Sequence, residues 1–195
     1  MMEPSLNQIM NEYQDLQNNP IASIGACVGL SPNDPNNMRH WQCTLTGPQD
    51  SSYAGGLFYL DIKFPMNYPQ VAPEVKFLTP IYHINVNHMS PNMYPLGHIC
   101  MSTLFYWQPY YRIREVIANI FNLFYLGNPD SPYGLDRQDE MINRRQLYEE
   151  KIRYFTKKYA KFDQVVKEYD YWDFSYNPNP PKNNNNSNNN NNNEN

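Results

Sequence analysis

The sequence predicts a single α+β domain, in which an amphipathic helix precedes a group of strands and further helices follow a long irregular segment. Two observations support this class. Apolar residues recur at helical spacing near the N-terminus, alternate with polar residues between about residues 26 and 78, and return to helical spacing after residue 113. With 195 residues, the chain is also long enough to bury a complete core.

The first helix is expected over Ser5 to Gln17 and is expected to end before Pro20. Ser5 and Gln8 have the spacing of a capping box. The helix contains no lysine or arginine, so its polar face is acidic or neutral. Its apolar positions, at steps of three and four residues, are Leu6, Ile9, Met10, Tyr13 and Leu16.

Four strands are expected next, because apolar and polar residues alternate in segments bounded by glycine, proline and asparagine. Short turns between neighbouring segments favour an antiparallel meander. The predicted strands are Ala26 to Leu30, Trp41 to Thr46, Phe58 to Phe64 and Glu74 to Leu78.

The segment from Tyr82 to Pro109 shows no clear periodicity, and irregular segments of this length are often functional. A helix is expected from Ile113 to Phe124, with Gly127 as its C-terminal cap. Arg137 to Phe162 is expected to be helical, broken into two pieces.

The composition divides the chain into a folded domain at residues 1–162, an aromatic and acidic extension at 163–182, and a disordered asparagine-rich tail at 183–195. The aromatic residues between Val165 and Tyr176 suit either a docking peptide or a segment that folds back onto the domain, and we expect some ordered packing.

Charge and cysteine content exclude several classes of function. The formal net charge is −4, so nucleic acid is not expected as a partner, and the basic stretch from Arg137 to Lys161 is interpreted as a solvated helix face. Three cysteines at unrelated spacings argue against a disulfide framework or a zinc site. No stretch resembles a secretory signal or a membrane span, which favours the cytoplasm, the nucleus or both.

A series of motifs follows one another between about Leu6 and Phe162. The motifs are Trp41 to Pro48, Tyr53-x-Gly55-Gly56-x-Phe58, Phe64-Pro65-x-x-Tyr68-Pro69-x-x-x-Pro73, Ile81-Tyr82-His83-x-Asn85, Gly97-x-Ile99-Cys100, Trp107-x-Pro109, Asn128 to Pro132 and the helix from Arg145 to Ala160. Each motif alone is weak, but their order and spacing together are specific. In this register the chain resembles the ubiquitin-conjugating enzymes.

The resemblance implies the α+β ubiquitin-conjugating fold and a thioester on Cys100. The modifier, ubiquitin or a ubiquitin-like protein, would come from an activating enzyme and pass to a substrate lysine, usually with a ligase. It implies no cofactor, because ATP is used by the activating enzyme. Cysteine suits such a carrier because its thiolate is both a good nucleophile and a good leaving group. Cys27 and Cys43 are expected to be buried structural cysteines.

The resemblance also assigns roles around Cys100. Asn85 matches the asparagine that stabilises the oxyanion or orders the active-site loop, and both roles can hold together. His83 matches a histidine that supports the loop. Ser131 stands at the lysine gate, where many members have aspartate, so lysine attack is expected to be slower unless phosphorylation or a ligase helps.

Four further residues are expected at the ligase surface. They are Pro65, Gln70, Trp107 and Pro109, and Trp107 suits a position at the edge of the core equally well. Gln70 replaces a residue that is often apolar or aromatic, so the preferred ligase can differ.

Three departures from the family leave alternatives open. Ile84 replaces a proline, the segment Val86 to Ile99 is about twice the usual length, and the first helix lacks its usual basic residues. The long segment is either an exposed insertion or a flap over the cysteine. The alternatives to a ubiquitin carrier are a weak or inert binding module of the same fold, a carrier for a NEDD8- or SUMO-type modifier, and a thiol hydrolase, which would need a histidine beside Cys100.

Overall fold

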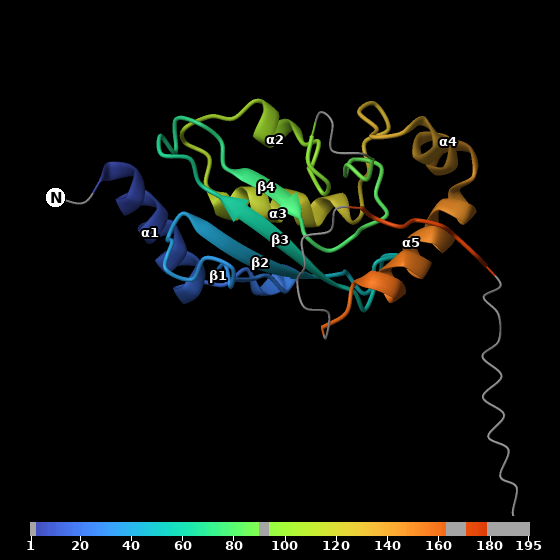
Figure 1. Cartoon of the computed structure of the whole chain (residues 1–195), viewed down its shortest axis with the longest axis horizontal. Coiled ribbons are helices and arrows are strands. Elements are labelled where there is room, and N and C mark those ends of the chain that lie inside the picture. Colours follow the sequence, from blue (N-terminus) through green and yellow to red (C-terminus); the bar gives the residue numbers. More distant parts are fainter. Residues whose placement is uncertain (1–2, 90–93, 163–170, 179–195) are drawn as a thin grey trace, which may run out of the picture.

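The computed structural model describes residues 3–89, 94–162 and 171–178, and it confirms the α+β arrangement (Figure 1). Each predicted helix and strand is present with its ends within two residues of the expected positions, except that the last helix ends at Tyr159, three residues before the expected end at Phe162. The elements are α1 (Pro4–Asn18), the 3-10 helix η1 (Ala22–Ile24), β1 (Cys27–Leu30), β2 (His40–Thr46), β3 (Leu57–Lys63), β4 (Glu74–Phe77), α2 (Ser102–Phe105), α3 (Ile113–Leu123), α4 (Leu135–Asn143) and α5 (Arg145–Tyr159).

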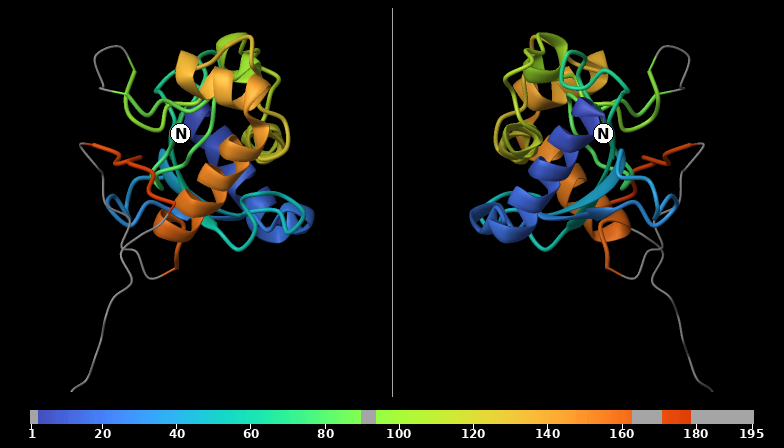
Figure 2. Two further views of the ribbon diagram at one scale, coloured as in Figure 1. Left: turned by 90° about the vertical axis from the view of Figure 1, so that its right-hand side faces the viewer. Right: turned by 90° about the vertical axis from the view of Figure 1, so that its left-hand side faces the viewer.

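The four strands form one antiparallel sheet in the order β1-β2-β3-β4, which confirms the predicted meander. Its register places Trp41 opposite Ile62 and Cys43 opposite Leu60, and all four side chains are fully buried. Figure 2 shows the helices gathered mainly on one side of the sheet. The core therefore lies between the sheet and the helices.

A buried carboxylate joins α1 to α3. Glu12 of α1 accepts hydrogen bonds from the Tyr68 hydroxyl (2.9 Å) and from the backbone N–H of Ile113 (2.9 Å), the first residue of α3. The first N–H groups of a helix have no partner within the helix, and the helix dipole favours an anion there. Glu12 thereby fixes the start of α3. The other end of α3 supports the loop that contains His83 and Asn85.

Two predicted helix caps are wrong. Ser5 does not cap α1, which already begins at Pro4 because proline favours the first helical position; its hydroxyl instead accepts a hydrogen bond from Arg39. Gly127 does not cap α3, which ends with Phe124 as its cap residue. A Cβ at Gly127 would lie 2.8 Å from a methyl group of Ile84, so the glycine permits close packing under the active-site loop.

The predicted break in the last helical stretch falls between α4 and α5. Residues 171–178 pack beside α5: the Phe174 ring lies 4.8 Å from that of Phe155, and Asp173 pairs with Lys158 at 2.9 Å. This part of the extension therefore folds back onto the domain. The rest of the extension, at 163–170 and 179–182, and the asparagine-rich tail lie outside the described residues. None of the described helices is long and apolar enough to cross a membrane.

Candidate active site

Backbone pairing of the two ends of the long loop positions Cys100. The Cys100 N–H donates to the Asn85 carbonyl (2.9 Å), and Val86 forms a β-bridge with Ile99. Gly97, two residues before this bridge, has a φ of 80°, and a Cβ there would lie 2.0 Å from the Phe77 carbonyl oxygen. Only glycine lets the chain pass this close to β4, which explains the glycine three residues before the cysteine.

Asn85 ties the Cys100 loop to the loop that carries Ser131. Its side chain is fully buried, and its amide nitrogen donates to the carbonyls of Asn128 (2.8 Å) and Ser131 (2.9 Å). Its amide oxygen accepts from the Asn128 N–H (2.7 Å). An amide group has only two N–H donors, so both are already used to hold the loop.

His83 lies beneath this loop and is 3% exposed. One ring nitrogen lies 2.9 Å from the Leu123 carbonyl at the end of α3, and the other lies 3.0 Å from the Asn85 N–H. These partners require a neutral ring that donates to Leu123 and accepts from Asn85. Burial lowers the pKa of His83 to about 4, so the ring is neutral at pH 7.

The replacement of proline by Ile84 adds a hydrogen bond to the loop. The Ile84 N–H, which a proline would lack, donates to the Tyr148 hydroxyl of α5 (2.9 Å), and the Ile84 carbonyl accepts from the Tyr133 N–H (2.8 Å). The side chain is fully buried. The loop therefore gains a tether to α5 in exchange for the fixed φ of proline.

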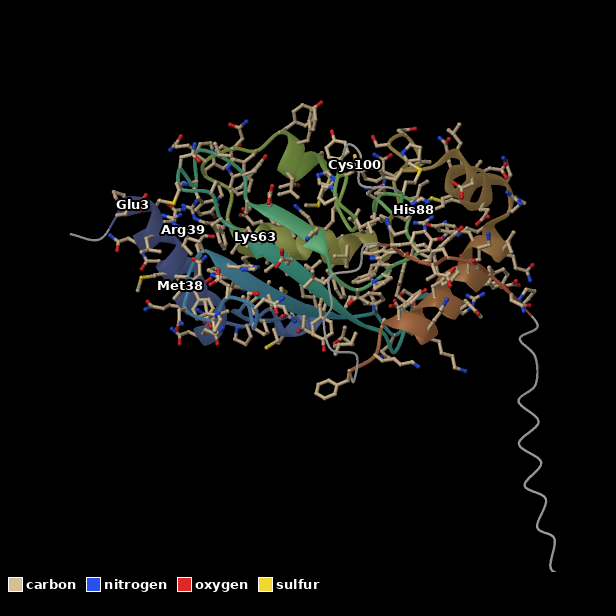
Figure 3. The ribbon with its side chains drawn as sticks, in the orientation of Figure 1. Glu3, Met38, Arg39, Lys63, His88 and Cys100 are labelled. Atoms are coloured by element: carbon tan, nitrogen blue, oxygen red, sulfur yellow. The ribbon has the colours of Figure 1, made fainter. Side chains whose placement is uncertain are left out.

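Cys100 is half-buried in a cleft of about 820 Å³ (Figure 3). Ser131 and Tyr133 line one wall, while Tyr94 and His98 of the long loop line another. Ser131, which the resemblance places at the lysine gate, is exposed. Residues 90–93 of the long loop lie outside the described residues, so the structure leaves the choice between insertion and flap open.

The two other cysteines differ from each other. Cys43 is fully buried, and burial raises the pKa of its thiol to about 12. Cys27 is exposed at the start of the edge strand β1, so the expectation that it is buried is wrong. Its backbone pairs with that of Thr44 in β2, and its side chain is exposed.

The four residues predicted at the ligase surface lie on two loops that contact each other. The Trp107 indole N–H donates to the Pro69 carbonyl (2.7 Å), and its ring packs 5.9 Å from that of Tyr68. Trp107 is therefore a residue at the edge of the core that also joins the loops. Gln70 and Pro109 are exposed and Pro65 is half-buried, beside the exposed apolar side chains of Met66, Val71, Tyr106 and Tyr110.

The prediction that Arg137 lies on a solvated face is wrong. Its side chain is fully buried, donates to the His83 carbonyl (3.0 Å), and packs against the rings of Tyr82 (4.1 Å) and Phe174 (4.7 Å). Arg137 and Glu140 are three positions apart and lie on the same, buried face of α4. This spacing was the one sign in the sequence that Arg137 could be buried. The contact of His98 with Tyr133 could not be predicted from the sequence, since nothing in the spacing of the two residues connects them.

The chain is similar to known proteins over most of its length. Residues 8–156 match the model of the family described as ubiquitin-conjugating enzyme. Ubiquitin-conjugating enzyme E2 13 of Saccharomyces cerevisiae is 37% identical over 155 residues, covering 79% of this chain and 94% of the relative. Ubiquitin-conjugating enzyme E2 14 of Schizosaccharomyces pombe is 34% identical over 159 residues, covering 80% and 95%.

A solved structure supports the same conclusion about the fold. The E2 domain of a ubiquitin-conjugating enzyme of Toxoplasma gondii superposes with a TM-score of 0.68 at 26% identity. The match covers 80% of this chain and 98% of that domain.

Proposed function

The chain belongs to the ubiquitin-conjugating enzyme family, and from that premise we propose that Cys100 carries ubiquitin or a ubiquitin-like modifier as a thioester. The modifier comes from an activating enzyme and passes to a lysine of a substrate protein, usually with a ligase. The chain needs no cofactor of its own, because the activating enzyme uses the ATP.

The observation that carries this proposal is the position of Cys100 in an open cleft without a histidine partner. Among the described residues no hydrogen bond joins the Cys100 thiol to a histidine, and both ring nitrogens of His83 are engaged elsewhere. A thiol hydrolase needs such a pair to activate its nucleophile. A carrier is better served without one, because it receives its acyl group by exchange between thiols and must then protect the thioester from water.

Asn85 acts in this scheme mainly by ordering the loop. Its two N–H groups hold the carbonyls of Asn128 and Ser131, and its backbone carbonyl holds Cys100. Donation to a tetrahedral oxyanion would require one of the two side-chain bonds to break. His83 supports the same loop from below, and Ser131 positions the incoming lysine without acting as a strong base.

The activating enzyme meets a first helix of unusual charge. The carboxylates of Glu3 and Asp15 pair with Arg39 (3.1 Å) and Arg114 (2.8 Å), which come from other parts of the chain (Figure 3 shows Glu3 and Arg39). The exposed charge of α1 is therefore largely neutralised. We expect the activating enzyme to contact this face through hydrogen bonds and apolar contacts more than through its own acidic residues.

The ligase contacts the surface formed by Pro65, Gln70, Trp107 and Pro109. Exposed apolar side chains beside these residues supply the contact area that such an interface requires. The chain acts in the cytoplasm, the nucleus or both, and neither nucleic acid nor a membrane is a partner.

The test is incubation with activating enzyme, ATP and either ubiquitin or a ubiquitin-like modifier, followed by a non-reducing gel. We expect an adduct that a thiol reductant removes, that Cys100→Ala lacks, and that Cys27→Ala retains. Cys27→Ala is the matched control because Cys27 is the exposed thiol away from the cleft. Failure of the folded wild-type chain to form an adduct with any modifier would favour the inert binding module.

A further inference from the structure

The gate residue Ser131 leaves the cleft without a carboxylate at the position where an amine would approach. A lysine that attacks a thioester must lose a proton as the amide forms, and a serine hydroxyl is a poor acceptor for it. Other acceptors in the cleft therefore become important. The lining contains the carboxylates of Asp61 and Glu74 and the side chains of His98 and Tyr133, which contact each other. It also contains the exposed Tyr94.

The contact between His98 and Tyr133 joins the two walls of the cleft. The Tyr133 hydroxyl lies 2.5 Å from Nδ1 of His98. His98 is two residues before Cys100, and Tyr133 is two residues after Ser131. The pair therefore links the backbone that carries the nucleophile to the backbone that carries the gate.

Both partners are held in place. The Tyr133 N–H donates to the Ile84 carbonyl (2.8 Å), and the carbonyl of His98 accepts from the Asn87 N–H (2.9 Å). The Tyr94 ring stacks on His98 with ring centroids 4.5 Å apart. A side-chain pair fixed by backbone bonds on both sides can present an oxygen atom in a constant position.

The protonation states suit a proton acceptor. Burial lowers the pKa of His98, with Glu74 opposing the effect, so the ring is neutral at pH 7 and Nδ1 can accept. Burial, assisted by the nearby Cys100, raises the pKa of Tyr133, so its hydroxyl keeps its proton. Tyr133 therefore donates to His98, and the lone pairs of its oxygen can accept a hydrogen bond from the amine.

We propose that Tyr133 and His98 form the acceptor for the attacking lysine, with Tyr133 as the residue that touches the amine. This inference rests on the proposed carrier function. The hydroxyl and the imidazole together would accept the proton that Ser131, which has no carboxylate, cannot accept.

The step balances as follows. The neutral lysine nitrogen bonds to the carbonyl carbon of the thioester, and the bond from that carbon to the Cys100 sulfur breaks, so that the sulfur leaves as thiolate. The surplus proton of the nitrogen passes to the Tyr133 oxygen, while the Tyr133 hydroxyl proton passes to Nδ1 of His98. The resulting imidazolium then loses its proton to water.

The two carboxylates of the cleft are weaker candidates. Asp61 is buried, and its oxygens face His40 (2.6 Å) and Lys63 (3.6 Å). Glu74 is exposed at the start of β4 and has no bond to the Ser131 loop among the described residues. Glu74 remains the natural competitor, and the experiment includes it.

The experiment is single-turnover discharge of the preformed thioester to free lysine, with loading by the activating enzyme measured separately. We expect Tyr133→Phe and His98→Asn each to slow discharge tenfold or more while loading stays within about twofold of the wild type. Loading transfers the modifier to a thiol and needs no amine acceptor. Tyr125→Phe is the matched control, because it removes a tyrosine hydroxyl that bonds Asp50 (2.8 Å) and does not line the cleft, and it should discharge at the wild-type rate.

Asparagine at position 98 keeps a polar partner for Tyr133 but accepts no proton, so the single variant His98→Asn tests the imidazole itself.

A double variant, Tyr133→Phe combined with Ser131→Asp, separates the role of Tyr133 from a packing effect. Ser131→Asp should accelerate Tyr133→Phe by a larger factor than it accelerates the wild type, because the new carboxylate replaces the lost acceptor. Equal factors would contradict the inference, because the carboxylate at position 131 would then not replace a lost proton acceptor.

The inference would also be overturned if Tyr133→Phe or His98→Asn discharged at the wild-type rate. It would be overturned too if Glu74→Gln were the one variant that discharged slowly. A wild-type chain that never forms the thioester would instead refute the proposed function. The two failures are therefore distinguishable.

Discussion

His83 and His98 belong to the same active-site region, yet their surroundings make them different groups. His83 is almost fully buried, and both of its ring nitrogens meet backbone groups, at Leu123 and Asn85. His98 lines an open cleft, and its Nδ1 meets a side-chain hydroxyl, that of Tyr133. Backbone partners fix a histidine in one neutral form, whereas a hydroxyl partner in a cleft leaves it able to exchange a proton.

This contrast separates the base of the loop from the wall of the cleft. The base is formed by His83, Ile84 and Asn85, and its hydrogen bonds hold the backbone that positions Cys100. The wall, formed by His98, Ser131 and Tyr133, holds the groups that can meet a substrate. Changes at the base should therefore alter stability, and changes at the wall should alter the rate of lysine transfer.

The largest expected effect concerns the pH dependence of stability at the base. The pKa of His83 is about 4 in the folded chain and about 6.5 when unfolded. Between these values the unfolded chain binds a proton that the folded chain does not, so the free energy of unfolding falls as the pH falls. The contribution is complete above pH 6.5, and about 3 kcal/mol of it is lost on acidification to pH 4.

Urea denaturation across this range measures the effect. The slope at pH 5 should be about 1.2 kcal/mol per pH unit smaller in His83→Gln than in the wild type. His88, whose pKa burial also lowers to about 4, provides the same slope in both proteins. An unchanged slope in His83→Gln would show that His83 does not remain neutral in the folded chain.

The next effect tests whether Asn85 orders the loop. Asn85→Ala removes two donors and one acceptor and leaves backbone groups of Asn128 and Ser131 without their partner. We expect a loss of about 2–3 kcal/mol in the free energy of unfolding, together with slower loading and discharge. Asn143→Ala is the control, because that side chain bonds Asp139 on the exposed side of α4 and should change stability little.

If Asn85 acted only as a hydrogen-bond donor to the oxyanion, Asn85→Ala would give a different result. In that case Asn85→Ala would keep the wild-type unfolding midpoint and slow only the acyl-transfer steps. The combination of stability and rate data therefore decides between the two roles.

The smallest expected effect concerns the segment that covers the base from outside. Phe174 contacts Phe155, Tyr82 and the buried guanidinium of Arg137. Phe174→Ala should lower the free energy of unfolding by about 2 kcal/mol, less than a fully buried phenylalanine would, because the ring is half-buried. Tyr171→Ala is the control, with a side chain that is 71% exposed, and a similar loss in both variants would contradict this role for Phe174.

The fold and the base of the loop could be predicted from the sequence because their signals are local. Alternation gave the strands of the meander, and His83, Asn85 and Cys100 stand in motifs of fixed spacing. The contact between His98 and Tyr133 spans 35 positions and depends on two irregular loops, so periodicity carries no trace of it. The position of Arg137 was predicted wrongly because a charged residue on a polar helix is normally exposed, and only the three-dimensional structure shows the two aromatic rings that pack against it.

The central claim is that Cys100 carries the modifier through its thiol. Mass spectrometry of the loaded chain under non-reducing conditions tests it most directly. The account predicts an increase equal to the mass of the modifier less one water, located on the peptide that contains Cys100 and removed by a thiol reductant. The same increase on the Cys27 peptide, or on a lysine with Cys100 unmodified, would contradict it.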